Sequence, residues 1–381
     1  MYLTRRTALL GLGAVTLSAC ATTTTATRIG SSSTGLPADL RPTPNAAYDA
    51  WVASFRGRAA SAGISQSTLN AAFRGTGYLP GVVRRDRNQT EFTRTLEDYL
   101  SIAASDERVS KGRAAYARHR STLNAVEARY GVPANIVTAI WGLESFYGER
   151  RGDVPVISAT STLAFDGRRG AFFEKQLIEA LRILQSGDVS PANMTGSWAG
   201  AMGHTQFIPT SYQAFAVDFT GDGRRDIWSD DPSDSLASTA AYLSRNGWQS
   251  GQSWGREVTG DAAGTVIQPQ PGGPRFAVTR NFRVIKTYNN SDSYAIGVGH
   301  LADRIAGGGP LRGSFPPDRY GLTKDDRVDL QRRLTAQGFD TDGADGVLGP
   351  KSRAAITAYQ TSRGLPATGD PSVELLRSLG G

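Results

Sequence analysis

The chain has 381 residues, of which 39% are hydrophobic and 20% charged, so it is long enough for two or three globular domains. Its net charge of +7 is compatible with a polyanionic partner, but Lys and Arg are scattered, without a basic stripe interleaved with aromatic residues. We therefore expect no nucleic acid partner. The three histidines form no metal-binding motif and no G-x-S-x-G motif occurs, which argues against a zinc peptidase and a serine esterase.

The N-terminal residues are typical of an export signal. Arg5 and Arg6 precede an apolar run over residues 8–17 that is too short to span a bilayer. The arginine pair leaves both general secretion and twin-arginine export open. The sequence Leu-Ser-Ala-Cys that ends at Cys20 looks like a bacterial lipobox, and an ordinary signal peptide with an incidental cysteine is the alternative. We expect residues 1–19 to be an export signal and Cys20 to be lipidated.

The next residues change in texture from a tether to helices. Residues 20–45 are rich in Thr, Ser, Ala and Pro, which indicates a flexible tether. From residue 46 apolar residues recur at helical spacing, and a mainly α domain is expected over residues 46–306. Helices are predicted from residue 46 onward and around residues 65–74, 91–103, 107–130, 133–147, 171–186 and 234–246.

The last third of the chain contains two further changes in composition. Residues 250–290, rich in Gly, Thr, Val and Gln, predict a few short strands or a loop-rich subdomain. A Gly- and Pro-rich linker is expected over residues 307–321. It precedes a small separate unit of three short helices over residues 322–381.

The stretch AIWGLESFYG, residues 139–148, places a carboxylate within an apolar helix. At helical spacing Glu144 shares a face with Ile136 and Ile140, so we expect it to be buried. Burying an unpaired carboxylate costs several kcal/mol, or forces it to take up a proton. Two interpretations remain open from these residues alone: Glu144 pairs with an arginine as a structural acid, or it holds a proton for proton-transfer chemistry.

Three stretches together resemble the lytic murein transglycosylase B family over about residues 46–305: GVPANIVTAIWGLESFYG, SATSTLAFDGRRGAFF and WAGAMGHTQFIPTSYQAFAVDFTGDGRRDIW. The resemblance implies a lysozyme-like fold, mainly α within the α+β class. It implies non-hydrolytic cleavage of the β-1,4 bond between MurNAc and GlcNAc in peptidoglycan glycan strands, which leaves 1,6-anhydroMurNAc ends. It also implies that Glu144 is the single catalytic acid and base, with no cofactor for catalysis.

The same resemblance implies the residues that bind the substrate. Ser197 and Gln206 match positions that hydrogen-bond near the acid and the sugars, whereas His204 stands where relatives often carry Tyr. A tyrosine ring can stack on a sugar while its hydroxyl reaches a sugar hydroxyl, and core packing is the alternative for each tyrosine. The tyrosines that match sugar-contacting positions are Tyr99, Tyr242, Tyr288 and Tyr294.

The segment DFTGDGRRD, residues 218–226, resembles an EF-hand-like calcium loop. Position twelve of the loop is Ser229 rather than Glu, which argues against a standard sensor loop. The sequence leaves two alternatives, a structural Ca²⁺ site or a tight Asx-type turn without metal. The expected ligands are Asp218, Thr220, Asp222, the backbone carbonyl of Arg224, and Asp234.

The segment VDLQRRLTAQGFDTDGADGVLGPKSRAAITAYQTSRGLPATG resembles the small three-helix peptidoglycan-binding domain. Such a domain would hold the enzyme on its polymer and raise the local substrate concentration. Its expected core consists of Leu330, Leu334, Ile356, Tyr359, Leu365 and Leu376.

We therefore expect a monomeric lipoprotein, anchored through Cys20 in the outer membrane and facing the periplasm, because Ala21 rather than Asp follows the cysteine. The first rival is a true muramidase, in which Asp166 or Asp153 activates water. The second rival is a non-enzymatic wall-tethering protein in which Glu144 belongs to a buried ion pair.

Overall fold

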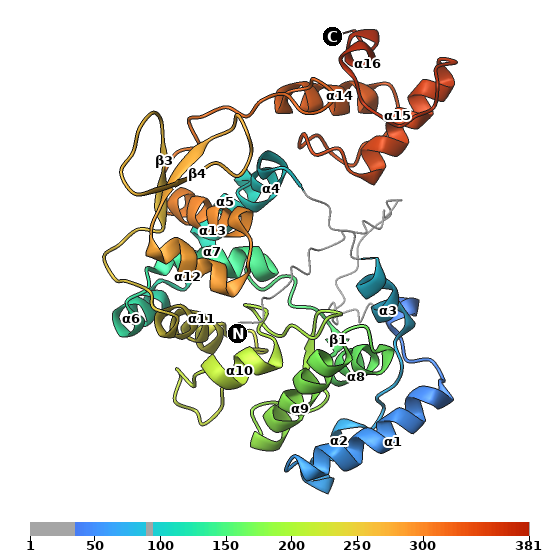
Figure 1. Ribbon diagram of the computed structural model, residues 1–381, viewed down its shortest axis with the longest axis vertical. Coiled ribbons are helices and arrows are strands. Elements are labelled where there is room, and N and C mark those ends of the chain that lie inside the picture. The colour runs from blue at the N-terminus through green and yellow to red at the C-terminus, as the bar shows by residue number, and fades with distance from the viewer. Residues whose placement is uncertain (1–34, 89–93, 381) are drawn as a thin grey trace, which may run out of the picture. The chain divides into compact units, whose positions relative to one another are not determined.

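The computed structural model describes residues 35–88 and 94–380, and these are mainly helical with two small antiparallel sheets (Figure 1). The mainly α class expected from the sequence is therefore confirmed. The export signal and Cys20 lie outside the described residues. The described chain forms two compact units, one of residues 35–88 and 144–242 and the other of residues 94–143 and 243–380.

The first unit contains seven α-helices in the described residues, counting α11, which continues into the second unit. The predicted helices at residues 46, 65–74, 171–186 and 234–246 are present, whereas α3, α8 and α10 were not predicted. Its elements are η1 (Ala38–Leu40), α1 (Ala46–Ser61), α2 (Gln66–Ala72), α3 (Pro80–Arg87), β1 (Val154–Pro155), α8 (Val156–Asp166), α9 (Gly170–Ser186), β2 (Thr195–Gly196), α10 (Pro209–Phe215) and α11 (Ser233–Arg245).

Helix α8 lies at the centre of the first unit and packs along α9 (Figure 1). Its sequence is rich in Ser, Thr and β-branched residues, which is why helical spacing did not reveal it. The hydroxyls are buried because they donate back to the helix: Thr160 to the Val156 carbonyl at 2.7 Å and Ser161 to the Ile157 carbonyl at 2.6 Å. A hydrophobic cluster surrounds this helix, formed by Leu40, Leu79, Val82, Val154, Ala159, Leu163, Ala164 and Phe173.

One buried carboxylate connects α3 to the turn between α8 and α9. Asp86 is 1% exposed and accepts hydrogen bonds from Arg168 at 2.5 and 2.6 Å and from Arg169 at 2.6 Å. Burial opposes ionisation, but the two guanidinium groups outweigh it and hold the pKa of Asp86 below its ordinary value of 3.8. Asp86 therefore stabilises the first unit as a charged group.

The second unit contains the three-stranded sheet and, through α7, the segment that leads to Glu144. Its elements are α4 (Leu96–Ala103), α5 (Asp106–Arg118), α6 (Arg120–Tyr130), α7 (Ala134–Ser145), β3 (Gly255–Val258), β4 (Thr265–Ile267), β5 (Arg275–Val278), α12 (Arg280–Tyr288), α13 (Asp292–Ile305), α14 (Lys324–Ala336), α15 (Pro350–Ser362) and α16 (Val373–Ser378).

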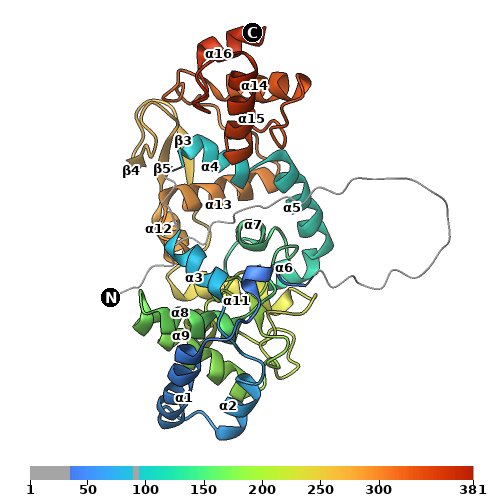
Figure 2. The same ribbon diagram turned by 90° about the vertical axis from the view of Figure 1, so that its right-hand side faces the viewer.

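Helix α13 is the centre of this unit and packs against α4, α5 and α12 (Figure 1 and Figure 2). The strand order is β3-β5-β4, all antiparallel, so the few short strands expected between residues 250 and 290 are present. The single helix predicted over residues 107–130 is wrong. The chain breaks at His119, which ends α5 and begins α6 while its ring packs edge-on against Trp141 at 5.4 Å.

The three helices expected near the C-terminus are α14, α15 and α16. Helix α14 begins at a capping box, in which Thr323 and Asp326 each bind the other's backbone N–H. Of the expected core residues all are buried except Leu365, which is 44% exposed, so that prediction is wrong. Leu365 lies in the turn after α15, where its backbone N–H donates to the Gln360 carbonyl at 2.9 Å. The cluster consists of Leu322, Leu330, Leu334, Ile356, Tyr359, Leu375, Leu376 and Leu379.

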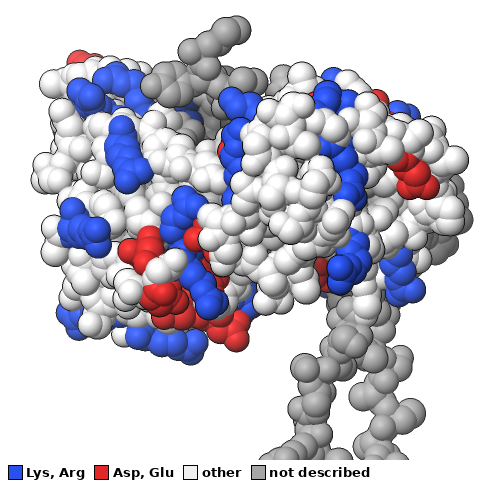
Figure 3. Space-filling view, turned by 90° about the horizontal axis from the view of Figure 1, so that it is seen from below, with Lys and Arg blue, Asp and Glu red and all other residues white. Residues whose placement is uncertain are grey.

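Two surface features bear on the setting of the protein. No helix within residues 35–88 and 94–380 has the length and apolar character needed to cross a bilayer. Figure 3 shows one face of the molecule, on which Lys and Arg side chains are scattered, with a group of acidic side chains among them. This face has no continuous basic stripe, in agreement with the distribution of charges along the sequence.

The Asp86 contact predicts a stability difference that depends on pH. Because Asp86→Asn removes a buried charged partner, we expect it to lower the free energy of unfolding at pH 7 by about 3 kcal/mol. A depressed folded pKa stabilises the fold above the unfolded value of 3.8, and this contribution is lost as the pH falls through the folded pKa. The difference between wild type and variant, measured by urea unfolding, should therefore be constant from pH 7 to about 5 and shrink below about 4.

The matched control is Asp49→Asn on the exposed face of α1. This change should alter the free energy of unfolding by less than about 0.5 kcal/mol at every pH. An Asp86→Asn difference that persists unchanged at the lowest pH would contradict the charged role of Asp86.

Candidate active site

The helix that carries Glu144 is buried over most of its length. Helix α7 follows Pro133, and the N–H of Ala134 donates to the carboxylate of Glu127 at 2.9 Å, which closes the helix start. Ile136 and Ile140 are buried as expected. Glu144 itself is partly exposed, so the expectation of a buried carboxylate is wrong. Glu144 lies in the last turn of α7, one residue before the buried Ser145.

The turn after Glu144 has an unusual backbone that the sequence did not reveal. Phe146 and Tyr147 have φ angles of 53° and 60°, in the left-handed region that bulky residues rarely occupy. Such conformations cost about 1–3 kcal/mol each and persist only where surrounding contacts hold them. Two features hold this turn. The guanidinium of Arg150 lies 4.7 Å from the centre of the Phe146 ring, and the hydroxyl of Ser145 forms hydrogen bonds with Gly148 and with His204.

Ser145 connects α7 to the loop that contains the predicted substrate-binding residues. Its hydroxyl donates to the carbonyl of His204 at 2.5 Å and accepts the N–H of Gly148 at 2.9 Å. Ser145 is fully buried, so neither bond competes with water. The residue next to Glu144 is therefore hydrogen-bonded to the loop that also carries Gln206.

The loop of residues 197–207 folds back on itself within the first unit. Met202 makes isolated β-bridges to both Gly196 and Phe207. The Ser197 hydroxyl accepts the N–H of Ala201 at 3.1 Å, and the Gln206 amide donates to the carbonyls of Arg151 and Gly203, each at 2.9 Å. Both side chains remain partly exposed, and Gln206 is itself left-handed, with φ of 53°.

Two glycines allow backbone segments to approach closely in and beside this loop. A Cβ atom on Gly203, which has φ of +70°, would lie 2.3 Å from the carbonyl oxygen of Ile227. A Cβ on Gly196 would lie 2.2 Å from the carbonyl oxygen of Ala201. Only glycine fits these two positions, because the neighbouring atoms are backbone and cannot move aside.

His204 is buried, and its ring lies within a network of polar contacts. Its ring is 3% exposed, and Nε2 lies 2.8 Å from the Ser229 carbonyl and 3.2 Å from Nη1 of Arg151. Arg151 also donates to the carbonyl of Trp228 at 3.0 Å and pairs with Asp230 at 2.7 Å. These contacts attach the loop to the residues that follow the predicted calcium loop.

The two carboxylates of the muramidase alternative lie in different surroundings. Asp166, at the end of α8, is 8% exposed at its side chain and pairs with Arg87 at 2.5 Å. Asp153 is exposed in the loop before β1. The ion pair gives Asp166 a structural function in the first unit.

The predicted sugar-contacting tyrosines differ in exposure. Tyr288 has no exposed surface and stacks on Tyr294, with 6.4 Å between ring centres and 6° between planes. Tyr242, 7% exposed, packs against Phe215 at 4.5 Å. A fully buried ring cannot stack on a sugar, so for Tyr288 the structure favours the packing alternative that the sequence left open. Tyr99 is partly exposed.

The predicted calcium loop is closed by hydrogen bonds to two carboxylates. Asp218 accepts the N–H groups of Gly221 at 2.6 Å and Gly223 at 2.9 Å. Asp234 is 2% exposed and accepts the N–H groups of Phe219 at 2.9 Å, Thr220 at 3.1 Å and Asp226 at 2.9 Å. The remaining predicted ligands Asp222 and Arg224 are exposed.

The electrostatics of this loop favour a cation, although its acidic groups are not gathered into a ring. Burial raises the pKa of Asp234, and the charge of Asp218 raises it further, against three backbone N–H donors. A divalent cation would offset the negative charges of the two carboxylates. The carboxylate, hydroxyl and carbonyl oxygens of the loop are the ligands that a hard cation prefers. Among residues 35–88 and 94–380, no three or more His, Cys, Asp or Glu side chains come together as a ready metal site.

Two family models match the chain. The model of the transglycosylase SLT domain matches residues 47–268 and 260–303, which include Glu144 and the loop described above. The model of the peptidoglycan binding domain matches residues 323–379, the segment of α14 to α16.

Several known proteins are similar to the chain. SltB3 from Pseudomonas aeruginosa, solved in complex with NAG-NAM-pentapeptide, is 43% identical; the match covers 88% of this chain and 100% of that one, with a TM-score of 0.70. The lytic transglycosylase Slt35 from Escherichia coli, in complex with calcium, is 27% identical over 69% of this chain and 93% of that one, with a TM-score of 0.59. Membrane-bound lytic murein transglycosylase B of Escherichia coli (strain K12) is 30% identical over 242 residues, 55% of this chain.

The matched region spans 66% of the length of that last relative, and all of the SltB3 chain. The transglycosylase model alone matches well over half of the residues of the chain. The resemblance that the sequence motifs indicated is thereby confirmed. The chain belongs to the transglycosylase SLT domain family of lytic transglycosylases, which are peptidoglycan-cleaving lyases, and it also carries a peptidoglycan binding domain.

Proposed function

We propose that this chain cleaves the β-1,4 bond between MurNAc and GlcNAc in peptidoglycan without using water, and leaves 1,6-anhydroMurNAc ends. The observation that supports it most is Glu144 at the end of α7, next to a strained turn and hydrogen-bonded through Ser145 to the loop of residues 197–207. The relative SltB3 has been solved in complex with NAG-anhNAM-pentapeptide, a ligand that contains the anhydro sugar.

The reaction needs one acid that also acts as a base. Glu144 donates its proton to the glycosidic oxygen as the bond from that oxygen to C1 of MurNAc breaks. The C6 hydroxyl oxygen of the same sugar then attacks C1, and its proton returns to the Glu144 carboxylate. Atoms balance without water, because the nucleophile belongs to the substrate.

The partial exposure of Glu144 suits this chemistry. A general acid must come within hydrogen-bond distance of the oxygen it protonates, which a fully buried carboxyl cannot do. A bound glycan strand would displace water from the carboxyl, and loss of water favours the neutral, proton-bearing form. The strained turn would keep the carboxyl in place while the proton is transferred.

The remaining substrate contacts are assigned in the same proposal. Ser197 and Gln206 would hydrogen-bond the sugars near the acid, and their partial exposure supports this. Tyr99 is the tyrosine whose exposure best supports sugar stacking. Tyr242 and Tyr294 would contact a sugar only at the edge of the ring, since each is almost entirely buried.

The setting of the enzyme follows from the other parts of the chain. The domain of residues 323–379 would bind peptidoglycan and keep the enzyme on its polymer. A lipid on Cys20 would anchor a monomer to the outer membrane, facing the periplasm. The tether expected over residues 20–45 would end before η1, because Leu40 is buried in the hydrophobic cluster of the first unit and Asp39 pairs with Arg84 and Arg85. The name of the Escherichia coli relative includes the words membrane-bound, which supports this arrangement.

We further propose that the loop of residues 218–226 binds a structural Ca²⁺ ion. Asp218, Thr220, Asp222 and the carbonyl of Arg224 would supply oxygen ligands, and Asp234 would balance the charge from behind the loop. The support is the raised pKa of Asp234, caused by its burial and in smaller part by the charge of Asp218, together with the calcium complex of Slt35. The ion would stabilise the fold and take no part in the proton transfers.

Glu144→Gln tests the proposed mechanism directly. Removing the acid should lower the release of anhydromuropeptides from purified sacculi by about 10²–10⁴-fold, since amides do not donate this proton. Mass spectrometry of the soluble products is the measurement, with Glu149→Gln, an exposed acid in the same turn, as the control that should retain activity. Reducing ends in place of anhydro ends would establish the muramidase alternative, and no new fragments from the wild type would establish the tethering alternative.

Ser145→Ala tests whether the strained turn positions Glu144. Its hydroxyl serves two backbone groups, so its loss should lower kcat about tenfold or more and leave KM nearly unchanged. Ser238→Ala is the matched control, because its hydroxyl is also buried and accepts one N–H, from Val217 at 3.0 Å. Equal losses of stability without a selective fall in kcat for Ser145→Ala would contradict the positioning role.

Calcium should raise the thermal midpoint of the wild-type chain in a concentration-dependent manner. At a hundred times its dissociation constant, the ion would add about 2.7 kcal/mol to the free energy of unfolding. Asp218→Asn should abolish this shift, and Asp261→Asn, an exposed acid between β3 and β4, should leave it intact. An equal calcium shift in Asp218→Asn, measured by scanning calorimetry against EDTA, would place the ion elsewhere.

A further inference from the structure

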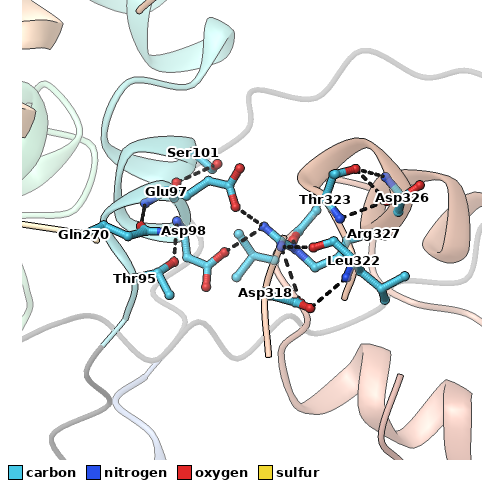
Figure 4. Close-up of polar contacts among 12 residues, drawn as sticks. Thr95, Glu97, Asp98, Ser101, Gln270, Asp318, Leu322, Thr323, Asp326 and Arg327 are labelled. Carbon is cyan, nitrogen blue, oxygen red and sulfur yellow. Dashed lines mark hydrogen bonds and ion pairs between the residues drawn. The ribbon is translucent and has the colours of Figure 1, made fainter. Parts of the chain in front are cut away.

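A buried arginine of the C-terminal domain reaches outside that domain. Arg327, on α14, has a side chain only 4% exposed. Inside its own domain Nε donates to the carbonyl of Gly346 at 2.7 Å and Nη1 to the carbonyl of Leu322 at 3.2 Å, and Nη1 also donates to the carboxylate of Asp318, in the preceding segment, at 3.4 Å. These contacts leave Nη2 directed at α4 (Figure 4).

The Nη2 group of Arg327 donates to two carboxylates on α4. Nη2 of Arg327 lies 2.6 Å from Oε2 of Glu97 and 3.2 Å from Oδ1 of Asp98. Glu97 is 11% exposed at its side chain, so the stronger contact is largely withdrawn from water. The backbone of Glu97 is also held in place, because its N–H donates to the amide oxygen of Gln270 at 3.0 Å (Figure 4).

A second attachment holds the segment that joins the C-terminal domain to the rest of its unit. The carboxylate of Glu257 on β3 accepts the backbone N–H of Arg312 at 2.8 Å and that of Gly313 at 2.7 Å. Its side chain is 10% exposed. The segment of residues 307–321, which the composition predicts as a linker, is therefore bound to the sheet through its backbone.

The charges at Arg327 show why this contact depends on one residue. A single guanidinium faces three carboxylates, those of Glu97, Asp98 and Asp318, within 3.4 Å. The planar guanidinium presents five N–H donors in a rigid fork, whereas a lysine has only three on a flexible stem. Without the guanidinium, the three carboxylates would repel one another, and α14 would separate from α4.

The contact lies next to a residue of the proposed substrate site. Tyr99 follows Asp98 on α4, and a Cβ atom built on Gly297 of α13 would lie 2.7 Å from its Cε1. One side of the Tyr99 ring is thus packed on α13, and its remaining surface is partly exposed. The position of α4 therefore determines where the ring of Tyr99 lies.

We propose that Arg327 is a positioning residue that fixes the C-terminal domain on α4 and so sets the place of Tyr99 for binding the glycan strand. The polymer-binding domain then acts as part of the sugar-binding surface, instead of as a freely moving anchor. The role given to Tyr99 rests on the proposed function, whereas the attachment of the domain to α4 does not.

Two variants of the full-length chain test the contact from its two sides. Arg327→Met removes the guanidinium, but it also removes contacts inside the C-terminal domain. The double variant Glu97→Gln and Asp98→Asn removes the charges on α4 and leaves every contact of Arg327 inside its own domain. Arg333→Met is the matched control, since Arg333 lies on the same helix and pairs with Asp329 at 2.8 Å within it.

Two measurements report on the attachment without requiring activity. Trypsin cleaves after Arg319, which lies between the Glu257 attachment and α14, and this site should be cut about tenfold faster in the two test variants, because that stretch is no longer held through the domain. The amides of α4, residues 96–103, should exchange hydrogen faster in the same variants. Arg333→Met should match the wild type in both measurements.

The double variant decides between the possible results. Faster cleavage and exchange in both test variants would support the contact. Wild-type rates in the double variant would overturn the proposal whatever Arg327→Met shows, because Arg327 would then act only inside its own domain.

Activity adds a separate test of the part that concerns Tyr99. The double variant should raise KM for a soluble glycan fragment several-fold while kcat stays within about twofold, as expected for lost substrate binding. An unchanged KM would overturn the positioning of Tyr99. If the wild type released no anhydromuropeptides, the proposed function would fail, and the cleavage and exchange rates would still judge the attachment of the domain.

Discussion

Two consecutive left-handed residues, Phe146 and Tyr147, end the helix that carries Glu144, and the candidate active site depends on the contacts that hold them. The buried hydroxyl of Ser145 binds the carbonyl of His204 and the N–H of Gly148, and thus connects the strained turn to the loop of residues 197–207. Strain held by surrounding contacts is common at sites that must present a group in one orientation. The acid and the proposed sugar contacts of this loop therefore share one rigid support, instead of being placed independently.

Buried charges hold elements together in each unit by the same physical principle. Asp86 connects α3 to the turn before α9 through two arginines, and Arg327 connects α14 to α4 through carboxylates. Each central group is almost fully buried, so loss of a partner would leave a charge without water to solvate it. Such contacts specify one arrangement of the elements more than they add to stability, because desolvation of the charges offsets much of the attraction.

The sequence and the structure agree where the signal is local. Helix α9, predicted over residues 171–186, is observed close to both ends, and the predicted start of α1 at residue 46 agrees with the structure, whereas α8 was missed because its Ser and Thr residues hide the pattern. For the candidate site, the motif located Glu144 and the loop with Ser197 and Gln206, but not the exposure of the side chains. Tyr288 matched a family position and is nevertheless fully buried, and Leu365 was expected in a core that it does not enter. Burial depends on what packs against a residue, which spacing along one chain does not contain.

The family and the mainly helical class could both be read from contiguous residues, because motifs and helix periodicity are contained in short stretches, and the proposal that Glu144 is the acid comes from the same motifs. The strained turn, the bond from Ser145 to His204 and the contact of Arg327 with Glu97 could not. Ser145 and His204 are 59 positions apart, and Arg327 and Glu97 are 230 positions apart. Nothing in the local sequence of either partner shows that folding brings the two residues together. Whether a charged or polar side chain supports a site or merely faces water is a property of its folded neighbours, and only three-dimensional packing reveals them.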